Sequence, residues 1–235
     1  MPQNAGMSHG PTDPRWPKLL SLAVHEFRTP ITVVAGYIRM LLKDRAGPIT
    51  DQQRRLLEEA EKSCGRLSAL VAEMSDLSNL EGGTAALNRS TVDLRAAVEE
   101  AIAALPPLTD HEVGVDLQPG KRVSVPGDAT RLRAAIVSLM VALRRELVTT
   151  DRLLVHVSTG QLAGAPVAII AIGDEEQLPA ILAAEPANLP SFDEWRGGSG
   201  LSLGVARRVI GQHGGSLLGP PGESKAGAVA VLPTS

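Results

Sequence analysis

The sequence predicts an α+β protein, in which an N-terminal helical hairpin is followed by a two-layer α/β sandwich. Two observations lead to this fold class. Residues 18–43 and 51–81 place apolar side chains at steps of three and four, which is the spacing of a coiled-coil seam. Beyond residue 93, helical patterns alternate with short runs of period two, which are typical of strands.

The first helix is predicted from Lys18 to about Lys43. Its apolar residues form one heptad seam, which consists of Leu20, Val24, Phe27, Ile31, Val34, Ile38 and Leu41. The segment that follows contains Gly47 and Pro48, which interrupt a helical pattern. We therefore expect a long helix that stops at a short break.

The second helix is predicted to begin after Thr50 or Asp51, either of which can cap its N-terminus. Its seam consists of Leu57, Ala60, Cys64, Leu67, Val71, Met74 and Leu77. It should end near Glu81, because Gly82 or Gly83 can adopt the left-handed conformation of a C-cap. Two long helices joined by a short break form an antiparallel hairpin.

The assembly of this hairpin has two interpretations, because a single hairpin cannot cover both of its apolar faces. Two hairpins from two chains would form a four-helix bundle, which predicts a homodimer. Alternatively, the second half of the same chain covers the seam. The seam pattern favours the dimer.

The remaining sequence predicts three helices against a mixed sheet. Residues 1–14 are polar and rich in Gly and Pro, and we expect them to form a disordered tail. Residues 15–83 are expected to form the hairpin domain. Residues 84–235 are expected to form the second domain, which starts with a linker and a short strand. Helices are expected at 94–105, 129–147 (capped by Asp128) and 201–213. Strands are expected at 113–117, 123–125, 153–157, 167–172, 216–218 and 228–232, the third and fourth of them as a hairpin.

Composition excludes several classes of function. The net charge is −3 and aromatic residues make up 2%, so neither a basic nucleic-acid surface nor a base-stacking platform is expected. Cys64 is the single cysteine, which leaves no internal disulfide and no thiolate zinc cage. No stretch predicts a membrane span or a signal peptide, so we expect a cytoplasmic protein.

The sharpest candidate site is the motif His25-Glu26-Phe27-Arg28-Thr29-Pro30. Imidazole is a nucleophile at neutral pH, and the neighbouring Glu26 can orient it and stabilise charge that develops on attack. Thr29 lies four residues after His25, on the same helix face, and could position a water or a phosphoryl oxygen. Pro30 should bend the helix. The alternative is a surface histidine beside a kink, and the complete motif on a heptad helix favours function.

This motif resembles the H box of sensor histidine kinases of two-component systems, and residues 15–81 resemble their dimerisation and phosphoacceptor domain. The resemblance implies that His25 accepts the γ-phosphoryl group of ATP and passes it to an aspartate in the receiver domain of a response regulator. It also implies that Glu26 is the acid/base partner and that Thr29 assists dephosphorylation of the regulator.

The second domain resembles the GHKL-type ATP-binding domain of these kinases, a two-layer α/β sandwich of the histidine kinase ATPase type. Gly198 and Gly200 resemble the second glycine box, whose backbone N–H groups approach phosphate at a helix start. Asp174 ends a strand where the family's adenine-binding aspartate stands, although a loop carboxylate with no ligand is an equal alternative. Arg145 stands where the family has a lysine. The resemblance implies ATP and Mg²⁺ as cofactors.

Several positions depart from the family pattern. Ala142 replaces the Mg²⁺-ligating asparagine, and Ser138 replaces an earlier asparagine of the same helix, so the sequence predicts no metal ligand set of its own. Glu176 and Leu178 replace glycines of the first glycine box. Phe192–Arg196 resembles the phenylalanine box, but the glycine turn follows at once, so the lid over the nucleotide should be short.

These features lead to one functional hypothesis and one alternative. The hypothesis is a protein histidine kinase that autophosphorylates on His25 and transfers the phosphoryl group to a response regulator. The alternative is a histidine phosphotransferase or a pseudokinase with a non-functional ATP-binding domain, which the departures at Ala142, Ser138, Glu176 and Leu178 would favour.

Overall fold

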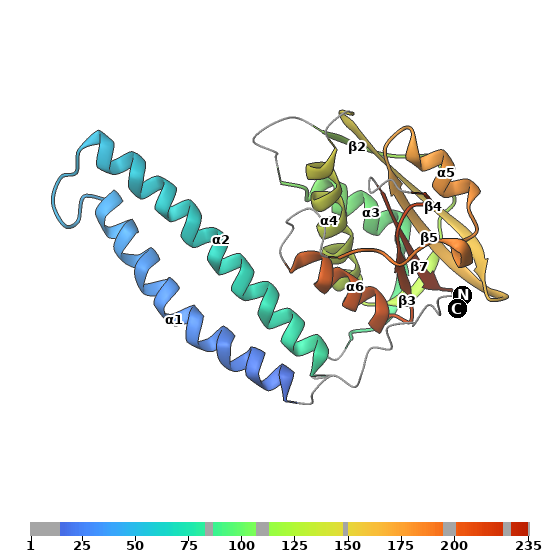
Figure 1. The fold of residues 1–235 in the computed structure, drawn as a ribbon, viewed down its shortest axis with the longest axis horizontal. Helices are drawn as coiled ribbons and strands as arrows, with labels where there is room; N and C mark the ends of the chain where they lie inside the picture. Colours follow the sequence, from blue (N-terminus) through green and yellow to red (C-terminus); the bar gives the residue numbers. More distant parts are fainter. Residues whose placement is uncertain are drawn as a thin grey trace, which may run out of the picture. The chain divides into compact units, whose positions relative to one another are not determined.

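The computed structural model describes residues 15–82, 87–106, 113–147, 150–194, 201–222 and 227–234. The chain divides into two compact units, Met1–Ala85 and Ala86–Ser235, the first a helical hairpin and the second an α/β unit (Figure 1). The predicted α+β fold class is therefore confirmed. The tail predicted over residues 1–14 lies outside the described residues.

The hairpin consists of α1 (Trp16–Leu42) and α2 (Asp51–Glu81). Its buried contacts come from one edge of the predicted seam, with Ala35 and Ile38 of α1 packed against Cys64 of α2. Near the open end of the hairpin, the Ser78 hydroxyl of α2 donates a hydrogen bond to the Pro17 carbonyl of α1, at 2.8 Å. Apolar packing and this bond fix the two helices side by side.

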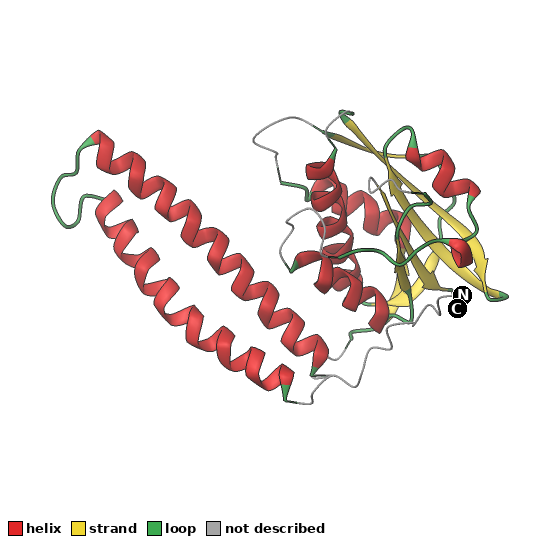
Figure 2. Ribbon diagram, in the orientation of Figure 1, coloured by secondary structure: helices red, strands yellow, loops and turns green. Residues whose placement is uncertain are grey.

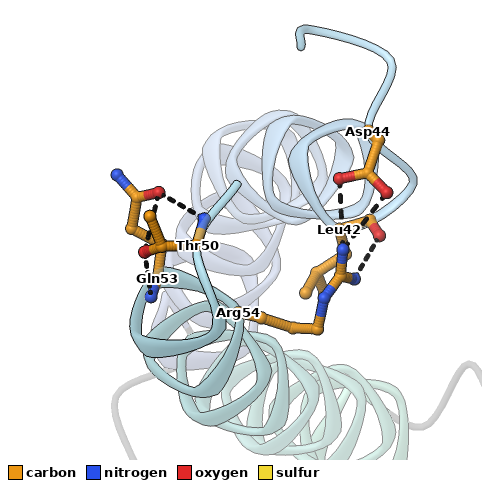
Figure 3. A network of polar contacts seen from close by, with 5 residues as sticks. All are labelled: Leu42, Asp44, Thr50, Gln53 and Arg54. Carbon is orange, nitrogen blue, oxygen red and sulfur yellow. Dashed lines mark hydrogen bonds and ion pairs between the residues drawn. The ribbon is translucent and has the colours of Figure 1, made fainter. Parts of the chain in front are cut away.

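Side chains from α2 hold the turn of the hairpin in place (Figure 3). Thr50 and Gln53 form a reciprocal capping box at the start of α2, as the sequence predicted for Thr50. Arg54 donates to the Leu42 carbonyl at 2.8 Å and to both carboxylate oxygens of Asp44 at 3.1 Å. Because Asp44 has a positive φ of 53°, the Arg54 contacts stabilise a backbone conformation that is uncommon outside glycine.

Of the two glycines that could cap α2, only Gly82 is described, because Gly83 lies outside the described residues. The helix ends at Glu81 and Gly82 follows it, as expected, but Gly82 has a φ of −74° and lies in the right-handed region. Its N–H reaches the Ser78 carbonyl at 2.9 Å, so the last described turn closes in a helical manner.

The second unit contains a five-stranded sheet in the order β2-β4-β5-β7-β6 and a two-stranded sheet of β1 and β3. The strands are β1 (Ser90–Asp93), β2 (Gly114–Leu117), β3 (Ser124–Gly127), β4 (Arg152–Leu162), β5 (Ala165–Gly173), β6 (Ser216–Leu218) and β7 (Gly227–Pro233). Only β2 and β4 pair in parallel among the described strands. The predicted hairpin of β4 and β5 turns at Ala163 and Gly164, both with positive φ.

Helices lie on both faces of the five-stranded sheet (Figure 2). The helices α3 (Leu94–Ala103), α4 (Ala129–Glu146) and α6 (Ser202–Gln212) share one face, as predicted. The opposite face carries α5 (Gln177–Ala183) and the short 3-10 helix η1 (Pro186–Asn188), which the sequence analysis did not predict. Alternation along each strand supplies both cores, so that Ile170 and Ile172 are buried on one face while Val167 and Ala171 pack under α5.

Within the described residues, no helix combines the length and the apolar character that crossing a membrane requires.

Candidate functional site

The His25 side chain lies on the exposed flank of α1. Its side chain is 78% exposed and that of Glu26 is 72% exposed, and His25 Nδ1 lies 3.8 Å from Glu26 Oε1. Val24 beside them is buried in the hairpin, which anchors this turn of the helix while the two polar side chains stay in solvent. The placement of His25 at the edge of the seam agrees with the sequence prediction.

This geometry suits a nucleophile. The carboxylate lies on the Nδ1 side of the ring, where it can stabilise a proton and the positive charge that forms when the ring attacks. In the tautomer that carries its proton on Nδ1, Nε2 holds the lone pair. Neither side chain is enclosed by the hairpin, so the ring is open to an approaching group on this unit.

Thr29 and Pro30 complete the turn that follows His25. Thr29 is exposed, one helical turn beyond His25 on the same face. Helix α1 continues without interruption through Pro30, although the proline cannot donate to the Glu26 carbonyl. Two residues later the Thr32 hydroxyl donates to the Arg28 carbonyl at 2.8 Å, a local bond often found where helices curve.

A large apolar surface remains uncovered on the hairpin. Of the predicted seam, Leu20, Val24 and Ile38 are buried, whereas Phe27 and Val34 are exposed in the single chain. The exposed large apolar residues of α1 and α2 are Trp16, Leu19, Leu22, Phe27, Val33, Val34, Tyr37, Met40, Leu56, Leu67 and Leu70. An apolar surface of this extent marks an interaction face.

Asp174 directly follows strand β5, close to the predicted strand end, and its side chain caps the next helix. Its Oδ1 accepts hydrogen bonds from the backbone N–H groups of Glu176 at 3.0 Å and Gln177 at 2.7 Å. These bonds start α5, so the carboxylate has a clear structural partner. The loop-carboxylate interpretation therefore has support, and Oδ1 is already engaged.

Helix α5 begins where the resemblance would place the first glycine box, whose glycines the sequence lacks. Leu178 and Ile181 of α5 are buried and pack on Val167, Ala171 and Val229 of the sheet. The leucine at position 178 thus anchors a helix at a place where glycines would leave an open loop. Glu175 and Glu176 are exposed, so their charges point into water.

Helix α4 carries Ala142 and Ser138, the two positions at which the resemblance would place asparagines. Ala142 is only 2% exposed and lies in the core. The Ser138 hydroxyl donates to the Ala134 carbonyl within the same helix at 3.0 Å. Arg145 is exposed in the last turn, as expected for a residue that meets a charged ligand or water.

The neighbouring Arg144 has a structural role. Arg144 is buried, its Nε donates to the Val113 carbonyl and its Nη1 to the Pro106 carbonyl, each at 3.0 Å. Burial lowers the pKa of its guanidinium, which nevertheless stays charged. Arg144 joins the end of α4 to the chain before β2, and so Arg145 alone remains available for a ligand.

Gly198 and Gly200 lie outside the described residues, and so do Trp195 and Arg196. The flanks of this segment are described. Phe192 is buried, and its N–H donates to the Leu217 carbonyl at 3.3 Å. Glu194 pairs with Arg207 of α6. The segment before the glycines is thus tied to both β6 and α6.

The structure therefore groups the predicted site residues in two places. His25, Glu26 and Thr29 share one turn of α1 in the first unit, and Asp174 and Arg145 belong to the second unit. No cluster of three or more His, Cys, Asp or Glu side chains suited to a metal ion occurs in the parts of the chain that the structure describes.

The sequence analysis did not predict the contacts of His213, a residue at the end of the expected helix 201–213. His213 follows α6 with Gly214 behind it at a φ of 75°, as the cap requires. Its ring is buried, accepts the N–H of Asp128 at 2.9 Å and lies 2.7 Å from the Val209 carbonyl oxygen. A histidine directly before two glycines was the available signal.

Comparison with known proteins identifies the hairpin. Residues 18–83 match the family described as His Kinase A (phospho-acceptor) domain. The circadian input-output histidine kinase CikA of Synechococcus elongatus is 29% identical over 206 residues, which are 85% of this chain and 27% of that protein. The signal transduction histidine-protein kinase BarA of Escherichia coli is 28% identical over 205 residues, which are 82% of this chain and 22% of that protein. The chain spans about a quarter of the length of these relatives.

Solved structures share the fold. Full-length ShkA in complex with AMPPNP superimposes with a TM-score of 0.61 at 21% identity, covering 93% of this chain and 46% of that one. The Acinetobacter baumannii histidine kinase AdeS gives a TM-score of 0.55 at 22% identity, covering 90% of this chain and 97% of that one. Both likenesses concern the fold.

Proposed function

We propose that this chain, which belongs to the sensor histidine kinase family, is a protein histidine kinase core that phosphorylates itself on His25 and passes the phosphoryl group to a response regulator. The observation that carries the proposal is the exposed His25–Glu26 pair within the matched phosphoacceptor hairpin.

The chemistry follows from the two side chains. The Nε2 lone pair of His25 attacks the γ-phosphorus of ATP, a P–N bond forms, and the bond from that phosphorus to the bridging oxygen breaks, so that ADP leaves. The Nδ1 proton faces Glu26, which stabilises the imidazolium and can take the proton. In the second step an aspartate oxygen of the regulator attacks the same phosphorus and the P–N bond breaks, which restores His25.

For the nucleotide we propose Asp174, Arg145, Gly198 and Gly200 as contacts. Asp174 would accept a hydrogen bond from the adenine amino group through the oxygen that does not cap α5. Arg145, exposed in the last turn of α4, would meet phosphate charge. The glycines would let backbone N–H groups approach phosphate ahead of α6.

The described residues do not fit a bound Mg²⁺ ion. Mg²⁺ needs oxygen ligands. Ala142 offers none and is buried, and the Ser138 hydroxyl is bonded within its own helix. We therefore derive no step through the metal.

Dimerisation is part of the proposal. The uncovered apolar residues of the hairpin, such as Phe27, Val34 and Leu67, would be buried in a four-helix bundle of two chains. The second partner is the receiver domain of a response regulator, for which the open surface around His25 and Thr29 leaves room.

The test is transfer of label from γ-³²P-ATP in the presence of Mg²⁺. We expect acid-labile, base-stable label on the wild type and on the control His156→Ala, and none on His25→Ala. Label that persists in His25→Ala, or a wild type that takes no label from ATP, would contradict the proposal.

One specific observation favours a second candidate, the histidine phosphotransferase. Ala142 and Leu178 are both used for packing, at positions where the family places nucleotide-site residues. If ATP gives no label but a phosphorylated receiver domain labels His25, the phosphotransferase is the correct assignment.

A further inference from the structure

A buried hydrogen-bond network surrounds His213 in the second unit. His213 is 2% exposed and lies directly after α6. A carbonyl oxygen only accepts, so the short contact to Val209 at 2.7 Å requires a proton on Nδ1. Nε2 must then be unprotonated, because it accepts the Asp128 N–H at 2.9 Å. The two partners together fix one neutral tautomer.

Asp128 extends this network to the segment that enters the unit. Its Oδ1 caps α4 by accepting the Arg131 N–H at 3.1 Å, and its Oδ2 accepts the Asn88 N–H at 3.1 Å. Next to it, Arg89 donates to the Gln212 carbonyl in the last turn of α6, at 3.1 Å. Residues 88–89 are thus held at the start of α4 and at the end of α6.

The His213 ring lies close to the backbone at the end of β3. A Cβ added at Gly127 would lie 2.8 Å from His213 Cδ2 and 2.8 Å from a methyl carbon of Leu132. Glycine at 127 therefore permits the ring to lie against the end of β3.

We propose that His213 is a positioning residue whose neutral ring locks residues 88–89, α4 and α6 together, and that a proton on Nε2 opens this lock. We call His213, Asp128, Asn88 and Arg89 the His213 lock. On protonation Nε2 loses its lone pair, and its new N–H faces the Asp128 N–H, donor against donor. Each carboxylate oxygen of Asp128 already accepts a backbone N–H group, so the carboxylate is held by the start of α4 and by Asn88.

The charges around the ring support this direction. The pKa of His213 lies below the ordinary histidine value. Burial lowers it most, and the positive charges of Arg89 and Arg131 lower it further. The Val209 carbonyl and the Asp128 carboxylate raise it, but they do not reverse the net direction. A base with a lowered folded pKa stabilises the fold above its unfolded pKa, and that stability is lost as pH falls through about 6.5 toward the folded value.

The consequence for activity rests on the proposed function. Helix α4 carries Arg145, and α6 follows the glycines proposed for phosphate. Opening the lock would loosen the two helices that flank the proposed nucleotide site and would detach the segment through which the hairpin is joined to them. Opening of the His213 lock would therefore lower the rate of autophosphorylation at mildly acidic pH.

Hydrogen exchange tests the lock without nucleotide. Protection of the Asn88 and Asp128 amides, corrected for the intrinsic pH dependence of exchange, should fall roughly tenfold for each pH unit below about 6.5 in the wild type, down to the folded pKa. The Gln177 amide, which donates to Asp174, should keep its protection. In His213→Gln, whose amide can both donate and accept, protection should not respond to pH, and His156→Gln should behave as wild type.

A titration of the His213 ring by NMR is the second measurement, which needs no variant. We expect the Nδ1–H tautomer and titration below the ordinary histidine value. Titration at or above that value, a protonated Nε2 at neutral pH, or a wild-type pH response in folded His213→Gln would each overturn the proposal. None of these outcomes involves His25, so labelling of His25 by ATP tests the proposed function separately.

Discussion

The two histidines to which we assign roles, His25 and His213, differ in exposure and in how far away in the sequence their partners lie. His25 is exposed beside Glu26, and its role could be predicted because the whole H box is contiguous in sequence. His213 is buried, and its partners Asp128 and Asn88 are distant in the chain, so no local pattern reports them. The same reason explains Arg144, whose two carbonyl partners come from the chain before β2. Contacts of long sequence separation are what single-sequence reasoning misses.

Thr29 provides a test at this scale. Thr29→Ala should leave phosphorylation of His25 intact, because the hydroxyl is not part of the His25–Glu26 pair, and should slow dephosphorylation of the regulator by up to about 100-fold, because a water loses its position. Rates of autophosphorylation and of regulator dephosphorylation measure the two effects.

Thr29→Ser is the matched control and should retain both rates. Equal loss of the two activities in Thr29→Ala would remove the role assigned to its hydroxyl.

At the scale of elements, the long helices were predictable and α5 was not. Helices α1, α2 and α4 carry many turns of apolar spacing and capping residues at Thr50 and Asp128, all of which the structure confirms. Helix α5 has 7 residues, contains Pro179 and has no side-chain cap from its own N-cap residue. Its start depends on Asp174 and its stability on Leu178 and Ile181 meeting the sheet, which only the folded unit reveals.

Ala142 allows a test of helix α4. Ala142→Asn should lower the unfolding free energy of the second unit by about 1–3 kcal/mol, because an amide enters a buried position. If the new oxygen ligates Mg²⁺, ATP affinity should rise with Mg²⁺ present and not in EDTA, as the family alignment of this helix predicts. Thermal unfolding and isothermal titration measure the two quantities.

Ala134→Asn, on the exposed side of the same helix, should change neither quantity. An unchanged ATP affinity in folded Ala142→Asn would show that the family alignment of α4 is misplaced.

At the scale of the whole molecule, the chain consists of two units, and the first of them is a hairpin with many large apolar side chains exposed. The four-helix bundle predicted from the heptad seam stays a proposal, and the exposure of Phe27 and Val34 in the single chain is what it requires. The boundary between the units could be predicted from the change of apolar period, because glycines and a linker separate the two patterns.

Val34→Lys should convert the dimer to a monomer. Each chain loses about 1.5–3 kcal/mol of apolar burial, and an unpaired ammonium cannot enter the bundle without further cost. Light scattering after size exclusion should give the mass of two chains for the wild type and one chain mass of 24.6 kDa for the variant.

Ser21→Lys, an exposed position on α1 outside the uncovered apolar set, should remain dimeric. A wild type that is monomeric at all concentrations would contradict the bundle.

The central hairpin of the sheet has a consequence for the kinetics by which this unit forms. Strands β4 and β5 have 11 and 9 residues, are neighbours in the chain, and turn at Ala163 and Gly164, so their pairing closes the smallest loop of any pair in the five-stranded sheet. We expect this pairing to be native-like in the transition state, with β2 joining late, because its parallel contact with β4 spans α4. A register error at this turn would shift the pairing of β5 with β7 and then of β7 with β6. The two residues of the turn therefore determine the register of these strands as well as that of β4 and β5.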